Sequence, residues 1–428
     1  MSPAGREESS LRDGLGSQSG RTGVRLGREC GPAVNPLPES ADAMRRQGPL
    51  WPIPTAAVLL LLLAVPAAAS AHATNATVST RAVPTPGSGG AVFTMTNAPS
   101  GNAVLAYTIG AGGTLSAAGV FSTAGTGTGV SLADQSALVL SQDHRFLLVV
   151  NAGDNTISLF AVHFPTSHGP ILDLLDVAGS QGVQPVSLTV FGPFVYVLNA
   201  GNATVGGNIA GFVLTPWGQL APLRSSVQPL STSAPTGPAE IAFNPTGTVL
   251  AVTEKGTSLI DTYPVDPRGF ARAPVVTPSN GSTPYGFAFS PQGTLIVSDA
   301  GPGALSSYAV ARNGHVSVVS GSVGDGQLAP CWVAVHGAYA FTTNAHSNTI
   351  SSYQIGWGGS LTLRIALAAS TGAADTDMAV GGPHGDYLLV YDAGAGEIQD
   401  FAFGNGGSLG SGYIVTGLPA TAEGLAAF

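Results

Sequence analysis

The chain has 428 residues with only 9% charged side chains, 59 glycines and 31 prolines, a composition that argues against long helices and favours short strands joined by turns. After residue 73, eight Lys and Arg stand against 18 Asp and Glu, a formal charge of −10. This balance argues against nucleic acid and anionic membrane surfaces as partners, because neither would find a basic patch.

The N-terminal part differs in composition from the rest. The first 48 residues contain seven of the 15 basic residues and show no apolar periodicity. We predict that residues 1–43 are a disordered extension or a mis-assigned start. From Met44, two arginines, an apolar run ending at Ala69 and small residues after it predict a signal peptide over residues 44–73, and hence a secreted or extracytoplasmic domain. A retained anchor is the alternative, although a span needs ~20 apolar residues and this run is shorter.

A hairpin pattern recurs after a Pro-, Thr- and Gly-rich linker at residues 74–90. Each copy is an apolar run, a polar turn and a second run rich in Ile, Ser and aromatic residues, which is typical of a β-hairpin. The turns begin at seven acidic or amide residues spaced 45 to 55 apart: Asn97, Asn151, Asn199, Glu254, Asp299, Asn344 and Asp392. A period near 50 with four strand-like runs per unit predicts β-propeller blades.

The first and last elements of the repeat complete each other. The first hairpin, Ala91–Asn97 and Asn102–Ile109, has no inner strand before it, whereas Ala422–Phe428 looks like an inner strand with no hairpin after it. We therefore predict an all-β fold over residues 91–428, a seven-bladed propeller of four-stranded antiparallel blades. The C-terminal strand would join the N-terminal blade and close the ring.

Three carboxylates at the inner-strand entries are the catalytic candidates. Propeller topology brings these entries and the hairpin turns to one end of the central channel, where Glu240, Asp377 and Glu423 could converge. Converging carboxylates can divide into an acid and a base, or hold a divalent cation through oxygen ligands. The alternative is that they bond to the backbone of neighbouring blades or face water in the channel.

The candidate ligand-binding residues are the hairpin-turn residues and two aromatic residues at the strand entries: Asn151, Asn199, Glu254, Tyr285, Asp299, Trp332, Asn344 and Asp392. Asn and Asp are also favoured in turns without any ligand, because they tolerate left-handed backbone and bond to their own main chain. The histidines lack metal-ligand spacing, and no nucleophile elbow or phosphate-binding loop is present. No cofactor is expected, and a divalent cation in the channel is left open with its ligands unknown.

Three segments resemble the seven-bladed lactonase superfamily of propellers with YVTN-type repeats, which includes 6-phosphogluconolactonases and carboxymuconate cyclases: Thr94–Tyr107, Val150–Phe160 and Gly286–Gly293. The resemblance covers about residues 90–428. It implies opening or closing of a lactone ring by acid and base groups at the channel face. Catalytic relatives present His, Arg and Glu there, whereas the matching entries read Ser136-Ala137, Gln184-Pro185, Pro238-Ala239, Pro284-Tyr285 and Pro330-Cys331. No catalytic residue is therefore carried over from the family.

Two functional hypotheses follow. In the first, an exported monomeric propeller binds a small-molecule lactone, a glycan or a surface protein at its channel face, and lactone hydrolysis is an open question. In the second, the chain is an active lactonase or cyclase on a neutral or sugar lactone and uses the channel-face carboxylates. An acidic rim disfavours a phosphorylated substrate. Carboxylates within ~5 Å of one another in a pocket would favour the enzyme, and carboxylates spread around an open rim would favour binding.

Overall fold

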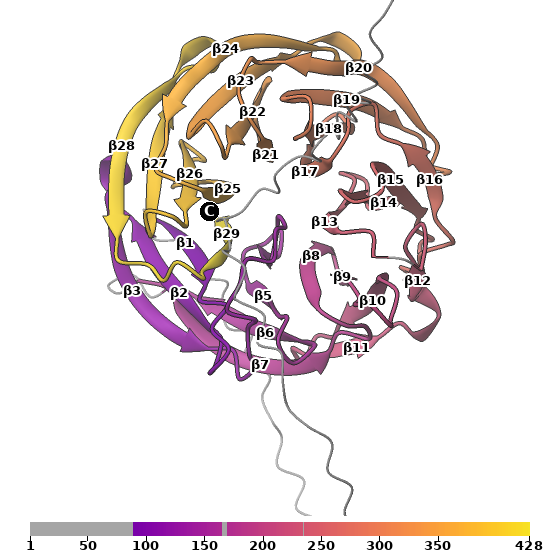
Figure 1. Ribbon diagram of the computed structural model, residues 1–428. Coiled ribbons are helices and arrows are strands. Elements are labelled where there is room, and N and C mark those ends of the chain that lie inside the picture. Colours follow the sequence, from indigo (N-terminus) through magenta and orange to yellow (C-terminus); the bar gives the residue numbers. More distant parts are fainter. Residues whose placement is uncertain (1–88, 165–168, 234) are drawn as a thin grey trace, which may run out of the picture.

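The computed structural model describes residues 89–164, 169–233 and 235–428. The predicted N-terminal extension, the signal peptide and most of the linker lie outside these residues. Seven β-sheets surround a central axis (Figure 1). Within the described ranges, no helix is long and apolar enough to cross a membrane.

Each blade is an antiparallel sheet whose strands run in sequence order from the centre outward, except at the seam of the ring. The blades, each from inner to outer strand, are β29 (Glu423–Ala427), β1 (Gly90–Met95), β2 (Ala103–Ile109) and β3 (Leu115–Ser122); β4 (Leu138–Leu140), β5 (Phe146–Asn151), β6 (Thr156–His163) and β7 (Ile171–Gly179); β8 (Pro185–Phe191), β9 (Phe194–Asn199), β10 (Asn208–Leu214) and β11 (Leu220–Pro222), with β12 (Gln228–Pro229) also on β10; β13 (Pro238–Phe243), β14 (Val249–Glu254), β15 (Leu259–Pro264) and β16 (Val275–Pro278); β17 (Pro284–Phe289), β18 (Thr294–Asp299), β19 (Ala304–Val310) and β20 (Val316–Gly324); β21 (Pro330–His336), β22 (Tyr339–Asn344), β23 (Thr349–Ile355) and β24 (Leu361–Ser370); and β25 (Asp375–Gly381), β26 (Tyr387–Asp392), β27 (Glu397–Phe403) and β28 (Leu409–Thr416). Four single 3₁₀ turns complete the described part: η1 (Ala111–Gly113), η2 (Arg224–Ser226), η3 (Trp357–Gly359) and η4 (Asn405–Gly407).

The C-terminal strand closes the ring, as the sequence predicted. β29 pairs antiparallel with β1, with Phe93 opposite Ala426 and Met95 opposite Glu423. The backbone groups of Ala91 and Phe428 exchange two hydrogen bonds of 3.0 Å. Figure 1 shows the yellow β29 beside the indigo β1. The first blade is thus built from both ends of the propeller, and its inner sheet edge is paired.

Burial falls from the inner strands to the outer strands. In β5 five of six residues are buried, whereas β7 alternates between buried, half-buried and exposed positions. Second strands lie between the neighbouring blades, so both faces are covered and the sequence is a continuous apolar run. The outer strands face solvent, and this explains why Ile171 and Leu174 on β7 are about two-fifths exposed. The core is therefore the set of blade-to-blade interfaces.

A left-handed residue precedes the inner strand of six blades by one or two positions. These residues, with φ between 55° and 68°, are Ser136, Gln184, Gly237, Thr283, Ala329 and Ala374. Left-handed backbone costs a non-glycine residue about 1 kcal/mol, so the bend is held by the surrounding structure. It lies where the connection from the preceding outer strand enters the inner strand of the next blade.

Candidate functional site at the channel mouth

The connection between β3 and β4, residues 123–137, leaves the rim and enters the channel. Figure 1 shows it as the purple loop that reaches the middle of the ring beside β5. Its segment Leu132–Ser136, here called the channel plug, is buried or half-buried throughout. No pattern in the sequence indicated this segment, and the residues predicted to line the channel meet it instead of open space.

Gln135 fixes the plug to the blades on the far side of the ring. Its side-chain amide donates to Val333 O at 2.9 Å and accepts from Val333 N at 3.0 Å. Its carbonyl accepts a 2.7 Å hydrogen bond from the Ser187 hydroxyl, and its N–H donates to Ala239 O at 3.0 Å. A methyl group at Gly286 would lie 2.0 Å from the Gln135 amide oxygen, so this blade leaves room for the plug by having glycine there.

The remaining plug residues contact the other blades. Leu132 N donates to Glu423 Oε1 at 3.0 Å, and Trp332 Nε1 donates to Asp134 O at 2.7 Å. The Ser136 hydroxyl donates to Glu240 Oε1 at 3.1 Å, and Ser136 N donates to an oxygen of Asp377 at 3.4 Å. With the Gln135 contacts, each of the six other blades therefore touches the plug. The polar residues of the channel mouth are used to hold a piece of the chain itself.

The three candidate acids, Glu240, Asp377 and Glu423, gather around this plug and are at most 3% exposed. Asp377 Oδ1 accepts from Met378 N at 2.7 Å, and its Oδ2 accepts from Leu425 N at 2.9 Å. Glu240 Oε2 accepts from the backbone N–H of the neighbouring β17 at 2.6 Å. The structure thus brings the three acids to one place, and each accepts a backbone hydrogen bond.

Burial raises the pKa values of these three acids. Loss of hydration raises the pKa of Asp377 to about 7, against the opposing effect of its backbone hydrogen bonds. Burial, aided by the charge of Asp377, raises the pKa of Glu423 to about 8, although hydrogen bonds to Ser131 and Leu132 act in the other direction. The pKa of Glu240 also lies well above its usual range because of burial. Part of this group is therefore protonated near neutral pH.

A fourth acid, Asp134, was not among the predicted site residues, because it lies in a connection with no pattern. It is 1% exposed, and neither carboxyl oxygen has a hydrogen-bond partner. Burial raises the pKa of Asp134 well above its usual value, and the charges of Glu423 and Asp377 add to the shift while Lys255 opposes it. We infer a protonated carboxyl at the centre of the plug.

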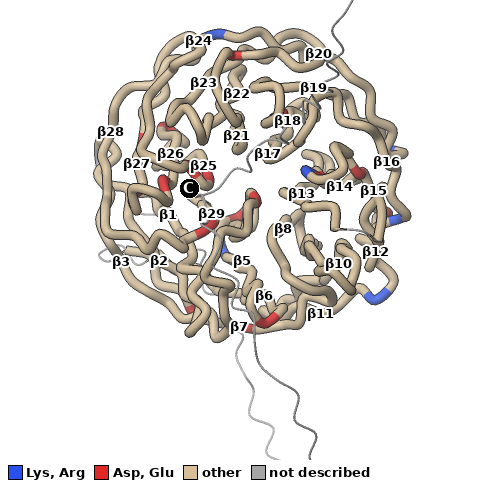
Figure 2. The backbone as a smooth tube through the Cα atoms, viewed as in Figure 1, with Lys and Arg blue, Asp and Glu red and all other residues tan. Residues whose placement is uncertain are grey.

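Lys255 is the one basic residue near this group among the described residues. Its ammonium donates to Ala133 O in the plug and lies 4.5 Å from the ring centroid of Tyr285. Figure 2 shows the acidic positions near β25, β29 and the inner loop gathered around the middle of the ring, with one basic position beside β13 and β14. In the part of the chain that the structure describes, no three His, Cys, Asp or Glu are arranged to hold a metal ion, so we derive no step through a cation.

The amide and acidic residues predicted to bind a ligand at the hairpin turns are fully buried. Asn151 Nδ2 donates to the Ser158 hydroxyl at 2.8 Å, and Asn344 Nδ2 donates to the Ser351 hydroxyl at 2.9 Å. Asp299 accepts from Ser306 in the same way. In all three blades the partner lies seven residues later, on the third strand. This repeated contact joins the second strand to the third. It is a structural role, but a different one from the expected bond to the residue's own main chain in a left-handed turn, because Asn151, Asn344 and Asp299 do not have positive φ.

The other predicted ligand-binding residues are also buried. Asn199 Nδ2 donates to Asn208 Oδ1 at 2.9 Å, Glu254 Oε1 accepts from Ser231 N at 3.0 Å, and Asp392 Oδ2 accepts from Gly372 N at 3.1 Å. The rings of Tyr285 and Trp332 pack edge to face with centroids 5.3 Å apart. All eight predicted ligand-binding side chains therefore lie beneath the surface of the channel end.

Two pairs of buried acids lie next to each other within blades. Asp375 and Asp392 are direct partners of β25 and β26, and burial together with Asp375 raises the pKa of Asp392 to about 10. Burial, with the nearby charge of Glu254, raises the pKa of Asp261 to about 8. In both blades the second acid nearby disfavours the ionised form of Asp392 and of Asp261, because a negative charge out of water is destabilised by another one beside it.

The comparisons with known proteins find matches among solved structures. No protein-family model and no curated protein matches the sequence. Among solved structures, the periplasmic gluconolactonase of Pseudomonas aeruginosa superposes with a TM-score of 0.63 at 19% identity, covering 79% of this chain and 98% of that one. A candidate 6-phosphogluconolactonase of Bacteroides fragilis gives 0.61 at 19% identity, covering 80% and 98%.

The fold is that of the lactonase-type seven-bladed propellers. The family resemblance seen in the sequence is confirmed at this level. The superposition covers about four-fifths of this chain and nearly the whole of each similar structure, a share that matches the extent of the propeller in this chain.

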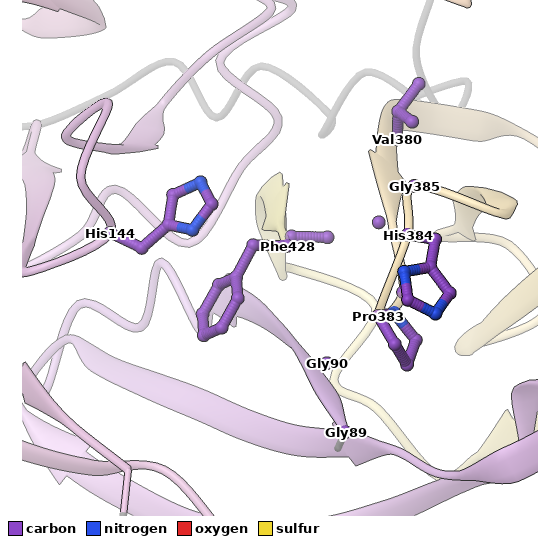
Figure 3. Close-up of a pocket in the computed structure, with 11 residues that line it drawn as sticks. Gly89, Gly90, His144, Val380, Pro383, His384, Gly385 and Phe428 are labelled. Carbon is purple, nitrogen blue, oxygen red and sulfur yellow. The ribbon is translucent and has the colours of Figure 1, made fainter. Parts of the chain in front are cut away.

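The opposite end of the propeller carries an open pocket of about 600 Å³ at the ring seam. Figure 3 shows His144 and His384 on its two sides, with Phe428 between them. The His144 imidazole stacks on the Phe428 ring at 4.7 Å, and partial burial lowers the pKa of His144. Both histidines come from turns between the first and second strands, so the pocket is separate from the plugged channel mouth.

Proposed function

We propose that this chain is an exported lactonase-type propeller that recognises a ligand or a partner at the plugged end of its channel. The burial of Glu240, Asp377 and Glu423 carries this proposal. Each accepts a backbone hydrogen bond and is at most 3% exposed, which leaves little room for a water molecule or a substrate carbonyl to approach. Recognition would instead use the outer side of the plug and the turns around it.

Exposed apolar side chains in three loops at this end support a recognition surface. Val130, next to the plug, is 55% exposed, Val205 in the β9–β10 turn is 43% exposed, and Leu328 in the β20–β21 connection is 63% exposed. They stand in three separate loops, and each would add apolar contact area to a partner bound at this end. One similar structure is named as a periplasmic protein, and this agrees with the signal layout in the sequence and supports export.

Lactone hydrolysis is the second candidate, because the similar structures are named as lactonases and two buried acids have a pKa near neutrality. Water would add to the lactone carbonyl, its proton would pass to an ionised carboxylate, and the ring C–O bond would break as the ring oxygen takes a proton from a neutral carboxyl. This reaction needs the plug to leave Asp377 and Glu423.

A lactone panel separates the two candidates. We expect no turnover of glucono-1,5-lactone, galactono-1,4-lactone or γ-butyrolactone above the spontaneous rate for the wild-type protein. Asp377→Asn and Glu423→Gln test the buried acids, and Asp386→Asn at the exposed opposite end is the control. Turnover that is lost in Asp377→Asn but kept in Asp386→Asn, with both variants folded by thermal unfolding, would overturn the binding proposal and support the hydrolase.

A further inference from the structure

The end of the ring away from the plug carries a tryptophan that lies almost wholly in water. Trp357 in η3 is 99% exposed. An indole offers on the order of 200 Å² of largely apolar surface, which proteins normally bury against the core or against a partner. A single exposed apolar residue needs no explanation, so the turn and its surroundings decide whether this one has a role.

The turn that carries Trp357 is firmly held. Gly356 N donates to Ser360 O at 2.7 Å, and Gly359 N donates to Gly356 O at 3.1 Å. Gly359 has a φ of 87°, and a Cβ there would lie 2.4 Å from Thr294 Oγ1 of the neighbouring blade. The backbone position of Trp357 is therefore fixed by the turn, and its indole projects from this turn into solvent.

This turn does not need a tryptophan. The seventh blade has the same five-residue turn, Gly404–Ser408, with Asn405 at the position of Trp357 and glycines of φ 69° and 82° after it. Its Gly404 N also donates to Ser408 O, at 2.9 Å. The first blade has Ala111 at the same position of its Gly110–Thr114 turn. The indole therefore serves something other than the conformation of the turn.

Trp357 is one of the residues that line a groove of about 870 Å³ between the fifth and sixth blades. The β17–β18 turn Pro291–Gly293 lines it from the fifth blade, together with Val310, and Ala338 lines it from the sixth. None of the lining residues is charged. Hydrogen-bonding groups come from the Gln292 amide, which is exposed, and from the backbone of the glycine-rich turns. Pockets of this size hold small ligands.

An uncharged ligand with one apolar face and several hydroxyl groups fits these surroundings. The C–H face of a pyranose ring can pack on an indole, and its hydroxyls can pair with amides and backbone groups. An anion would meet no cation among the residues that line this groove. Trp217, in the corresponding turn of the third blade, is also 84% exposed, but it does not line this groove.

We propose that the groove between the fifth and sixth blades binds a neutral saccharide, with the indole of Trp357 as the stacking surface and Gln292 as a hydrogen-bonding partner. The site lies at the other end of the channel from the plug and does not depend on the function proposed for that end.

Tryptophan fluorescence titration with cellohexaose, maltohexaose, mannohexaose and chitohexaose tests this site. We expect saturable quenching by at least one of these neutral hexasaccharides and none by hexagalacturonate, which is anionic. Trp357→Asn copies the turn of the seventh blade, so it should leave the thermal unfolding transition unchanged while weakening binding at least about tenfold, measured by isothermal titration calorimetry. Trp217→Asn is the matched control and should bind as the wild type does.

Three results would overturn the proposal. The first is the absence of saturable binding to all four neutral hexasaccharides. The second is an equal loss of binding in Trp217→Asn and Trp357→Asn. The third is a Trp357-dependent association of the protein with phosphatidylcholine vesicles or with itself by analytical ultracentrifugation, in the absence of saccharide binding, which would assign the indole to a lipid or a second copy.

Discussion

The two ends of the channel use the same residue types in opposite ways. At the plugged end, Trp332 and the turn residues Asn151 and Asn344 are buried and hydrogen-bonded within the protein. At the other end, Trp357 and Trp217 stand almost fully in water. Tryptophan, Asn and Asp in turns therefore do not mark a ligand site by their presence. Their exposure distinguishes a side chain that holds the ring together from one that is left for a partner.

The largest expected effect concerns the ring itself. Deleting residues 420–428 removes β29, leaves the inner edge of β1 unpaired and takes Glu423 away from the plug. We expect loss of the cooperative unfolding transition, measured by circular dichroism on heating. A synthetic peptide of residues 420–428 should restore the transition. A truncated chain that unfolds at the wild-type temperature would contradict closure by this strand.

Asp377→Leu should be the most damaging single change at the plugged end. It leaves Met378 N and Leu425 N without their acceptor in a buried site, at about 1–3 kcal/mol for each group. Asp377→Asn keeps one oxygen acceptor and should lose clearly less stability. Urea unfolding of both variants measures the difference, and equal stability of the two would show that these hydrogen bonds do not hold the channel mouth.

Stability should fall as the pH rises from about 5 to 8. The pKa of Asp377 is about 7 and that of Glu423 about 8, both above the values of an unfolded chain near 4. The folded state therefore binds more protons than the unfolded state. The stabilisation from this proton binding is complete below the pKa that the groups have in the unfolded chain, and it is lost as the pH rises through their pKa in the folded protein. Each group contributes a slope of about 1.4 kcal/mol per pH unit.

Denaturant unfolding at several pH values checks this slope. Asp377→Asn should be less pH-sensitive than the wild type, because one proton-binding group is gone. Asp386→Asn, at the exposed opposite end, is the control and should keep the slope of the wild type. A wild-type protein that is most stable at pH 8 would show that the buried acids are ionised in the folded state.

The smallest effects come from paired tryptophan changes at the two ends. Trp332→Phe loses the 2.7 Å hydrogen bond to Asp134 O and part of a buried ring, and should cost about 2 kcal/mol. Trp217→Phe changes an exposed ring and should stay within about 0.5 kcal/mol. The free energies of unfolding in urea test the pair. A similar loss of unfolding free energy at both sites would contradict the conclusion that the tryptophan at the plugged end holds the ring together and the one at the other end does not.

The architecture was predictable because each blade repeats the same local chemistry. The apolar second strands, the polar turns and the spacing of Asn and Asp recur along the chain, so seven blades and the closing strand can be counted from the residues alone. The same repeat placed Glu240, Asp377 and Glu423 near one end of the channel, and the structure brings them together around one segment.

The plug could not be predicted, because nothing in residues 132–136 repeats or alternates. Its side-chain contacts join residues that are 52 to 291 positions apart, from Gln135 with Ser187 to Leu132 with Glu423. Such pairs form only after the whole ring is assembled. The left-handed bends at Gln184 and Ala374 were equally hidden, since neither residue type favours that backbone.

The plug has a consequence for how the protein comes apart. The channel plug, Leu132–Ser136, contacts each of the six other blades. No single blade can therefore move outward without losing a contact with the plug. Detachment of one blade is therefore coupled to release of the plug from the channel. A circular permutant whose chain is opened in an outer loop between two blades should still fold, as long as the plug stays covalently joined to β3 and β4.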